Sequence, residues 1–441
     1  MPHKTFSVLL GILSKVFLVL SVVVISKHIS LDEFGWYEIA TTSINLLFPI
    51  LCAGSIDGIF RFCIDESGRK VVFSRLVLFG CLVFLILSPI VFLLLSFYFD
   101  FVVSVLILSL IFFNIILESI KQLKKSQGLL IYFTGAESLK SFSFLIFILA
   151  AAYSGSGFKI EFLLYMQVIS VLVTLFVVSF LSSIWNEFVF QKEILRINKD
   201  ELKYSLYMMP NTVLWWVLNA SDKIILGILS GPASVAIYSV ATKFPSLITS
   251  LNRIFMQLWH VAIVGGKGKI ENLWKVNMAL LNISFITLAV IFYFSFDLIF
   301  DKRYSQASDY VQWLLVGSYY SVLSSLLGGI FMRDKKPKVA LYSTLIAAIL
   351  NVALNIFFIP IYGVIGCVFS TVLSLAVLFF LRLLYITVRN LEPIGFFWAP
   401  ITHPCILIFP YLLTNGFYSA TTIISSIILI FTVRLFVRKI S

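Results

Sequence analysis

The stretch VLFGCLVFLILSPIVFLLLSF, residues 77–97, has no charged side chain and is long enough to cross a lipid bilayer as one helix. Comparable apolar runs of about 20 residues recur along the whole chain. Of its 441 residues, 60% are apolar and 12% are charged, whereas soluble domains carry about 25% charged residues. This composition excludes a water-soluble enzyme and a secreted disulfide scaffold. It predicts an all-α, polytopic membrane protein.

A window of about 19 residues predicts about fourteen transmembrane helices. They lie near residues 6–26, 36–57, 77–97, 101–119, 129–152, 161–183, 205–229, 235–262, 276–299, 309–331, 339–359, 361–384, 396–413 and 418–436. The first span carries Lys15, is longer than the apolar core of a signal peptide and lacks a small-residue cleavage site. We therefore interpret it as a transmembrane helix and not as a cleaved leader.

The positions of Lys and Arg predict the orientation of the spans. Most of the 33 Lys and Arg residues fall in segments on one side of the membrane, among them Lys121, Lys124, Lys125 and Arg382. The loops on the other side hold only Lys27, Lys159, Lys302 and Arg303. Because cytoplasmic loops are enriched in Lys and Arg, both termini are expected in the cytoplasm. Topology thus accounts for most of the net charge of +12, and no nucleic-acid partner is expected.

The residues typical of catalytic and metal sites are few and scattered. The five cysteines include no CxxC pair and the four histidines lie far apart, so neither a disulfide framework nor a metal site is indicated. The chain has no GxSxG, HExxH or P-loop motif. We expect a protein that is not an enzyme, with no catalytic residues, no cofactor and no ATP-driven step.

A faint internal repeat suggests two similar halves. Residues 35–41 align with residues 236–242, with Tyr, Ala and Thr matching at an offset of 201 residues. With six helices in each half, both halves enter the membrane in the same orientation, and a cleft between them is the expected transport path. The predicted organisation is a six-helix lobe at 1–183, a cytoplasmic linker at 184–203, a second six-helix lobe at 204–385 and two additional helices at 386–441.

Ionisable residues within membrane spans cost about 2.5–3.5 kcal/mol each, so they are candidates for a functional cavity or for a structural pair. Lys15 lies near the middle of the first span, too deep for its ammonium group to reach either interface easily. It is expected to line a polar cavity, with a pair to Glu38 or Asp57 on the next span as the alternative. Glu38 and Asp57 are candidates for ion coupling or for such a pair.

The seventh and eighth predicted spans carry further charges. Asp222 and Lys243 lie at equal depth on either side of the turn near Pro232, which favours an ion pair between them. Lys223 would then lack a partner and would face the cavity. Arg253 lies ten residues beyond Lys243 and continues a cationic stripe along the eighth span.

The fifth span has Glu137 and Lys140 at a spacing of three residues, which allows mutual neutralisation. Lys140 is nevertheless a candidate cavity cation. The predicted cavity cations are Lys15, Lys140, Lys223, Lys243 and Arg253, and the possible structural or coupling carboxylates are Glu38, Asp57 and Asp222. Such a set of cations indicates an anionic transported species, because Lys and Arg bind phosphate groups.

Three motifs, in order along the chain, resemble one known family. They are SLDEFGWY at residues 30–37, Pro210 followed by DKIILG at 222–227 and IYS at 237–239, and Asn351 and Asn355 followed by IPIYGVIG at 359–366. Together they are similar to the motifs of bacterial polysaccharide repeat-unit flippases, which belong to the multidrug/oligosaccharidyl-lipid/polysaccharide exporter superfamily. The resemblance covers roughly residues 5–385.

This resemblance implies a flippase that moves a lipid-diphosphate-linked oligosaccharide, such as an O-antigen repeat unit for lipopolysaccharide, by alternating access. The implied partners are an undecaprenyl-diphosphate-linked glycan, the lipid bilayer and other polysaccharide assembly proteins, and the implied location is the cytoplasmic (inner) membrane of a bacterium. Many members of the family have twelve spans. The last two spans predicted here are therefore either an accessory groove for the lipid tail or the result of a miscount.

Two alternatives remain at this point. An ion-coupled multidrug or solute exporter of the same superfamily would handle cations and would favour acidic residues in its cavity. A membrane glycan polymerase or ligase would carry a large outside loop, and the outside loops predicted here are short.

Overall fold

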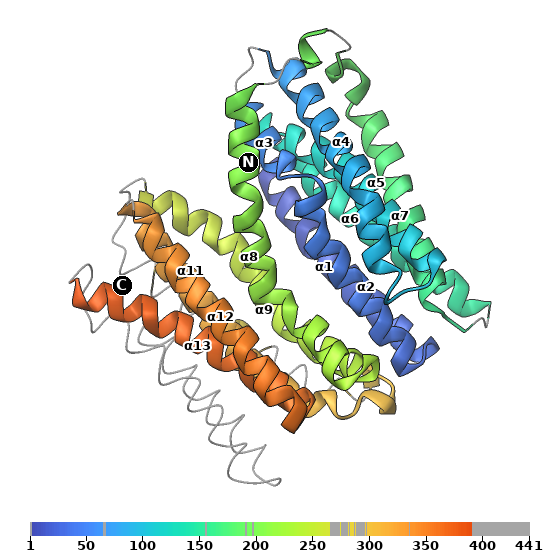
Figure 1. The fold of residues 1–441 in the computed structure, drawn as a ribbon, viewed down its shortest axis with the longest axis vertical. Coiled ribbons are helices and arrows are strands. Elements are labelled where there is room, and N and C mark those ends of the chain that lie inside the picture. Colours follow the sequence, from blue (N-terminus) through green and yellow to red (C-terminus); the bar gives the residue numbers. More distant parts are fainter. Residues whose placement is uncertain are drawn as a thin grey trace. The chain divides into compact units, whose positions relative to one another are not determined.

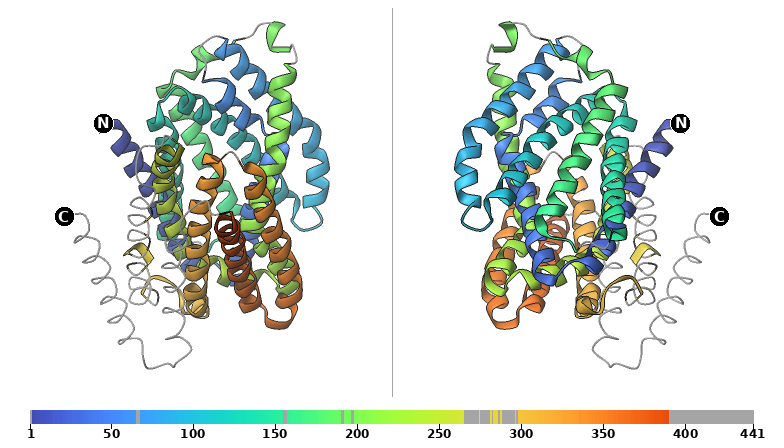
Figure 2. Two further views of the ribbon diagram at one scale, coloured as in Figure 1. Left: turned by 90° about the vertical axis from the view of Figure 1, so that its left-hand side faces the viewer. Right: turned by 90° about the vertical axis from the view of Figure 1, so that its right-hand side faces the viewer.

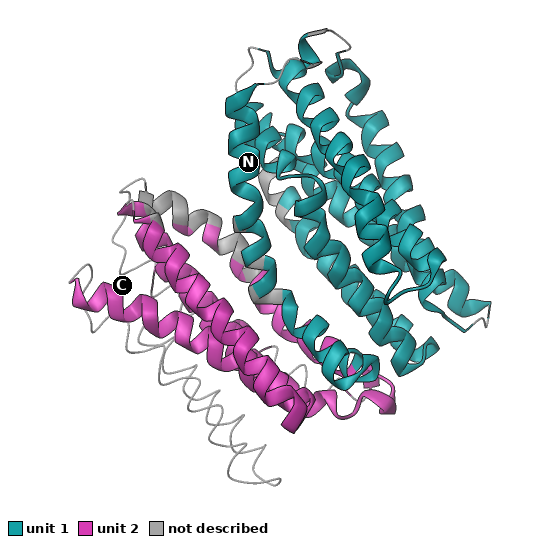
Figure 3. Ribbon diagram, in the orientation of Figure 1, with its two compact units in different colours: residues 1–236 teal, residues 237–441 magenta. Residues whose placement is uncertain are grey.

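A computed structural model describes residues 2–64, 68–154, 157–189, 192–195, 198–264, 298–334 and 336–389, together with single positions between 274 and 296 (Figure 1). Every regular element in this described part is helical, as the sequence predicts. The chain divides into two compact units, residues 1–236 and residues 237–441, which are described separately (Figure 3).

Unit 1 is a bundle of long helices that run alongside one another (Figures 1 and 2). Its elements are α1 (Pro2–His28), α2 (Leu31–Leu51), α3 (Ser55–Phe62), α4 (Arg69–Leu95), α5 (Phe101–Ser126), α6 (Leu130–Tyr153), α7 (Ile160–Leu181), the short 3-10 helices η1 (Ile184–Glu187) and η2 (Lys192–Leu195), and α8 (Lys199–Ser230). Helix α1 packs on α6, and α5 packs on α7. Helix α8, which the sequence analysis assigned to the second lobe, packs on α2 and α3 within this unit.

Helix α9 (Pro232–Val264) follows α8 after a turn at Gly231 and continues into unit 2. The other described elements of unit 2 are η3 (Lys302–Tyr304), α11 (Ala307–Arg333), α12 (Pro337–Tyr362) and α13 (Val364–Val388). Helix α13 packs against both α11 and α12. The predicted division into two six-helix lobes and a separate linker stays a prediction.

Eight of the described helices are long and apolar enough to cross a membrane, and α2 with α3 makes nine if this bent pair is one span. The two helices meet at an angle of 59°. Pro49 lies near the end of α2, and Ala53 and Gly54, between the two helices, adopt positive φ. Helices α8 and α9 occupy the predicted seventh and eighth spans and have 32 and 33 residues, and α8 is more polar than the eight apolar spans. Most of the predicted span 276–299, and all of 396–413 and 418–436, lie outside the described residues.

Corresponding tyrosines make corresponding contacts in the two units. Tyr37 on α2 accepts a hydrogen bond from Gln167 on α7, while the hydroxyl of Tyr238 on α9 lies 3.2 Å from that of Thr371 on α13. Both tyrosines are buried, and both belong to the aligned segments 35–41 and 236–242. Each therefore links the second helix of its predicted repeat to the sixth. The packing of α5 on α7 and of α11 on α13 repeats in the same way.

Two glycines of the sequence motifs, Gly35 and Gly366, lie where two backbones come close together. A Cβ atom at Gly35 on α2 would overlap the carbonyl oxygen of Pro232, at the start of α9. A Cβ atom at Gly366 on α13 would overlap the carbonyl oxygen of Phe358 on α12. Since backbone atoms cannot move aside as a flexible side chain can, only glycine fits these two positions without displacing a helix.

Replacing Gly35 with alanine should destabilise the protein by about 1–3 kcal/mol, the usual cost of overpacking. Thermal unfolding of the detergent-solubilised protein should show a lower melting temperature. Gly11→Ala is the matched control, because the nearest atom to its Cβ would be Thr134 Cγ2 at 4.0 Å and alanine favours the helix. Equal melting temperatures for the two variants would contradict this account of the motif.

Arg382 connects α13 to α11 and α12. It lies near the end of the predicted span 361–384, within α13, and its side chain is only 4% exposed. Its guanidinium donates to the carbonyl oxygen of Ser324 on α11 at 2.6 Å and to the hydroxyls of Ser343 and Thr344 on α12 at 3.1 and 2.9 Å. In the described part of unit 2 its partners are all neutral oxygens.

Arg382→Ala should lower the free energy of unfolding by about 2–4 kcal/mol, because it leaves a cavity and three acceptors without their charged donor. The exposed Arg389, two turns further along α13, provides the control Arg389→Ala, which should have little effect. Melting temperatures of both variants in the same detergent test this expectation, and similar values for the two would refute it.

Candidate functional site: a lysine–carboxylate network in unit 1

Seven charged side chains from α1, α3, α5 and α6 form one network inside unit 1. We call it the lysine–carboxylate network, and its members are Lys15, Asp57, Glu118, Lys121, Lys125, Glu137 and Lys140. Charges within a helical bundle are costly unless they are paired or reach water. The contacts described below show how these residues satisfy that requirement.

Lys121 on α5 is the most buried member, with 2% of its side chain exposed. Its ammonium group donates to Glu118, one turn earlier on α5, at 2.5 Å, and also to Glu137 on α6. It also lies 4.8 Å from the centre of the Phe133 ring. Lys121 thus joins α5 to α6 and has two carboxylate partners.

Glu137 lies at the centre of the network. It accepts a hydrogen bond from Lys121, lies 3.9 Å from Lys140 on its own helix and interacts electrostatically with Lys15 on α1. The close packing of α1 on α6 brings Lys15 to this position. Glu137 and Lys140 each expose 29% of their side chains, and Lys15 is half-buried. This side of the network is therefore less enclosed by protein than Lys121.

The break between α2 and α3 brings Asp57 into the network. Asp57 lies three residues beyond Gly54, close to Thr212 on α8, and interacts electrostatically with Lys125 on α5. Lys125 lies 4.5 Å from the Phe60 ring centre and 5.2 Å from that of Phe133. Non-helical backbone at membrane depth is tolerated where it is buried in protein or lines a cavity, and the buried Ala53 and Gly54 meet this condition.

A separate ion pair joins α2 to α8. The Lys223 ammonium donates to Glu38 Oε2 at 2.6 Å, with 18% of the lysine side chain and 5% of the glutamate side chain exposed. The expectation that Lys223 lacks a carboxylate partner is therefore wrong. The prediction failed because α8 packs on α2 in unit 1 and brings two residues that are 185 positions apart into contact.

The remaining predicted site residues are Asp222, Lys243 and Arg253, and their role in a cavity stays a prediction. Asp222 is buried on α8 in unit 1, and Lys243 is half-buried on α9 in unit 2, so the predicted pair between them stays a prediction. The backbone of Arg253 lies in α9, and its side chain is outside the described residues. The predicted proximity of Glu137 and Lys140 is confirmed by their 3.9 Å contact.

Three network residues, Glu118, Lys121 and Lys125, were not among the predicted site residues. The predicted fourth span ended at residue 119 and left Lys121 and Lys125 in a loop. That boundary is wrong, because α5 continues to Ser126. The spacing of Glu118 and Lys121 by three residues, with no Gly or Pro before Gly128, was the signal for a longer helix.

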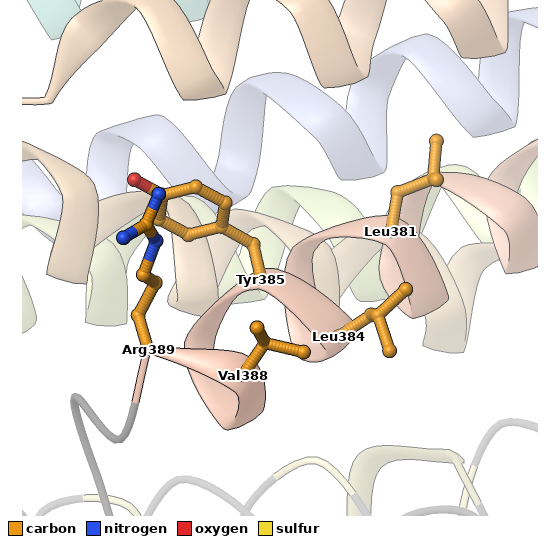
Figure 4. A pocket seen from close by; sticks show the side chains of 5 residues that line it. All are labelled: Leu381, Leu384, Tyr385, Val388 and Arg389. Atoms are coloured by element: carbon orange, nitrogen blue, oxygen red, sulfur yellow. The ribbon is translucent and has the colours of Figure 1, made fainter.

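A shallow pocket lies elsewhere, on one face of α13 in unit 2 (Figure 4). Leu381, Leu384, Tyr385, Val388 and Arg389 line it. The Arg389 guanidinium lies 6.0 Å from the Tyr385 ring centre, and the rest of the lining is apolar. This pocket has one charged residue, so its chemistry differs from that of the network. No group of three potential metal ligands occurs among the described residues.

The sequence matches a known protein family. A family model described as polysaccharide biosynthesis protein matches residues 4–258, more than half of the sequence. The chain belongs to the polysaccharide biosynthesis protein family. The matched region includes the whole lysine–carboxylate network and the Glu38–Lys223 pair. No curated protein shows significant sequence similarity.

This polysaccharide biosynthesis family member also resembles transporters of known structure. The lipid II flippase MurJ in an inward closed conformation has a TM-score of 0.67 at 14% identity, with 99% of this chain and 98% of that chain covered. An inward-facing multidrug resistance MATE family transporter of the MOP superfamily has a TM-score of 0.63 at 14% identity, covering 85% and 94%. At this identity the similarity shows the fold, which is that of polytopic MOP-superfamily proteins with about fourteen helices.

A third structure has a TM-score of 0.54 at 14% identity and covers 87% of this chain and 94% of its own. It is a MOP superfamily transporter from Pyrococcus furiosus, described as having a binding pocket of reversed polarity.

Removing one partner of the Glu38–Lys223 pair should destabilise this family member more than removing both. Glu38→Gln or Lys223→Met removes one charge of the pair and leaves the other poorly compensated, which should lower the free energy of unfolding by about 2–3 kcal/mol. The double variant removes both charges, so its loss should be smaller than the sum of the two single losses. Thermal unfolding of the wild type, both single variants and the double variant measures the coupling. Additive effects would show that the two side chains stabilise the fold independently.

Proposed function

We propose that the protein is a flippase that moves a lipid-diphosphate-linked oligosaccharide, such as an O-antigen or similar repeat unit, across the cytoplasmic membrane by alternating access. Its membership of the polysaccharide biosynthesis family and the fold that it shares with a lipid II flippase support a lipid-linked cargo. The observation that carries the proposal is the lysine–carboxylate network, in which four lysines meet three carboxylates.

The network suits an anionic group better than a cationic one. Its less enclosed side includes Lys140 and the half-buried Lys15, while Glu137 is surrounded by ammonium groups. Ammonium groups in a partly desolvated site bind phosphate oxygens by charge-assisted hydrogen bonds. A drug exporter for cations, the principal alternative, would instead need an excess of carboxylates at such a place.

The polar character of α8 supports a transport path through the protein. This helix is long enough to cross the bilayer but is more polar than the apolar spans. Transmembrane helices of this kind direct their polar residues to the protein interior or to a water-filled path, because lipid cannot solvate them. On this proposal Lys223 and Lys243, with Arg253, extend the cationic lining that begins at Lys15 and Lys140.

Orientation and energy input form part of the same proposal. The Lys and Arg distribution supports cytoplasmic termini, so that the cargo enters from the side on which lipid-linked sugars are assembled. Because the sequence has no P-loop motif, the cycle would use an ion gradient, the membrane potential or the gradient of the cargo. An undecaprenyl-diphosphate-linked glycan is the cargo that we propose.

Reversing charge at the less enclosed side of the network should abolish transport. In reconstituted vesicles, Lys140→Glu and Lys15→Glu should each reduce translocation of a polyprenyl-diphosphate-linked oligosaccharide by about tenfold or more, through lost charge-assisted bonds. Lys70→Glu on the exposed start of α4 is the control and should retain full activity. Unchanged translocation in both network variants, with normal melting temperatures, would refute the proposed role. Export of a cationic dye by the wild type, in the absence of lipid-linked cargo transport, would favour the exporter.

A further inference from the structure

Glu137 has an unusual environment for a carboxylate at a site proposed to bind anions. It contacts Lys121 on α5 and Lys140 on α6, and it interacts electrostatically with Lys15 on α1. These are the groups that an anionic cargo would need. With 29% of its side chain exposed, Glu137 lies on the less enclosed side of the network and not behind it.

Its three interactions differ in strength. Lys121 is nearly fully buried and donates a hydrogen bond to Glu137, whereas Lys140 is 29% exposed and lies 3.9 Å away. A pair at that distance is too long for a hydrogen bond, and holding it costs both side chains rotational freedom, so it contributes little. The interaction with Lys140 is therefore the one that an incoming anion can replace at small cost.

Lys121 does not depend on Glu137 for its neutralisation. It also donates to Glu118 at 2.5 Å, one turn earlier on the same helix. If Glu137 turned away, Lys121 would keep a carboxylate partner, while Lys140 and Lys15 would become available to another anion. The two carboxylates thus differ in role. Glu118 holds the buried Lys121, and Glu137 can leave Lys140 and Lys15.

We infer that Glu137 is a built-in competitor for the anionic group of the cargo: it pairs with Lys140 and Lys15 in the empty site and is displaced when the diphosphate binds. This inference rests on the proposed function. An intramolecular carboxylate acts at a high effective concentration, so only an anion that binds both lysines strongly can replace it. A diphosphate does so because it carries several charges and several acceptor oxygens.

Displacement has a second consequence, which concerns release. When the cargo begins to leave, Glu137 returns to the lysines and occupies them before the phosphate can rebind. The carboxylate therefore weakens binding and speeds dissociation together. A transporter without it would bind its cargo more tightly and would turn over more slowly, a combination that simple loss of structure does not produce.

Farnesyl diphosphate, a short polyprenyl diphosphate, is a suitable probe, and its affinity for the purified full-length protein can be measured by calorimetry. Glu137→Gln keeps the size of the side chain and removes its charge, so it should bind the probe about tenfold more tightly than the wild type. In vesicles at saturating cargo its translocation rate should fall, and half-saturation should occur at a lower cargo concentration.

Three further variants make the experiment decisive. Glu118→Gln removes the other carboxylate of Lys121 and should change the affinity much less, because Glu118 does not hold Lys140. The double variant Lys15→Met/Lys140→Met should lose binding, which identifies the site. Glu137→Asp retains the charge but shortens the side chain, so it should give an intermediate affinity, and it serves as the test if Glu137→Gln does not fold.

The outcomes separate this inference from the proposed function. If the wild type binds the probe and neither folded Glu137 variant binds it more tightly, the competitor role is wrong and the flippase proposal stands. If neither the wild type nor any Glu137 variant binds the probe, the proposed diphosphate cargo is wrong, and the inference fails with it. Tighter binding with an unchanged or faster translocation rate would also overturn the role in release.

Discussion

A charge inside a membrane-spanning bundle must find a partner or water, and this constraint accounts for the arrangement of unit 1. The buried Lys121 satisfies it with two carboxylates, Glu118 and Glu137, and in doing so links α5 to α6. The remaining charges follow from that link, since Glu137 in turn lies beside Lys140 and Lys15. Paired charges at the protected side and partly exposed charges at the other side are what distinguish a binding region from a purely structural ion pair.

Much of the fold could be predicted because each span must supply a long apolar run, which the sequence displays directly. The site was harder to predict, because apolarity marks where a helix is embedded and not which helix lies beside it. Lys140 and Glu137 were found from their spacing on one helix, but the Glu38–Lys223 pair joins residues 185 positions apart and depends on how α8 packs. Lys121 was missed for another reason: the predicted fourth span ended at residue 119, whereas α5 continues to Ser126 with Lys121 buried.

Buried positive charge is handled in two ways in this molecule. Lys121 is surrounded by carboxylates, whereas Arg382 is held by a carbonyl and two hydroxyls from neighbouring helices. The difference follows from the two side chains. A guanidinium spreads its charge over a planar fork with five donors, so neutral oxygens on several sides can satisfy it, while an ammonium concentrates its charge at one point. The arginine can thus serve as a tie between helices, and the lysine network is left to respond to anions.

The paired tyrosine contacts, Tyr37 with Gln167 and Tyr238 with Thr371, bear on how the molecule can deform. Each joins the second helix of a repeat to the sixth, across the helices that lie between them in sequence. Two helices fastened in this way resist sliding past one another. The stiffness of each bundle therefore depends on side-chain contacts between distant segments as well as on the covalent turns between consecutive helices.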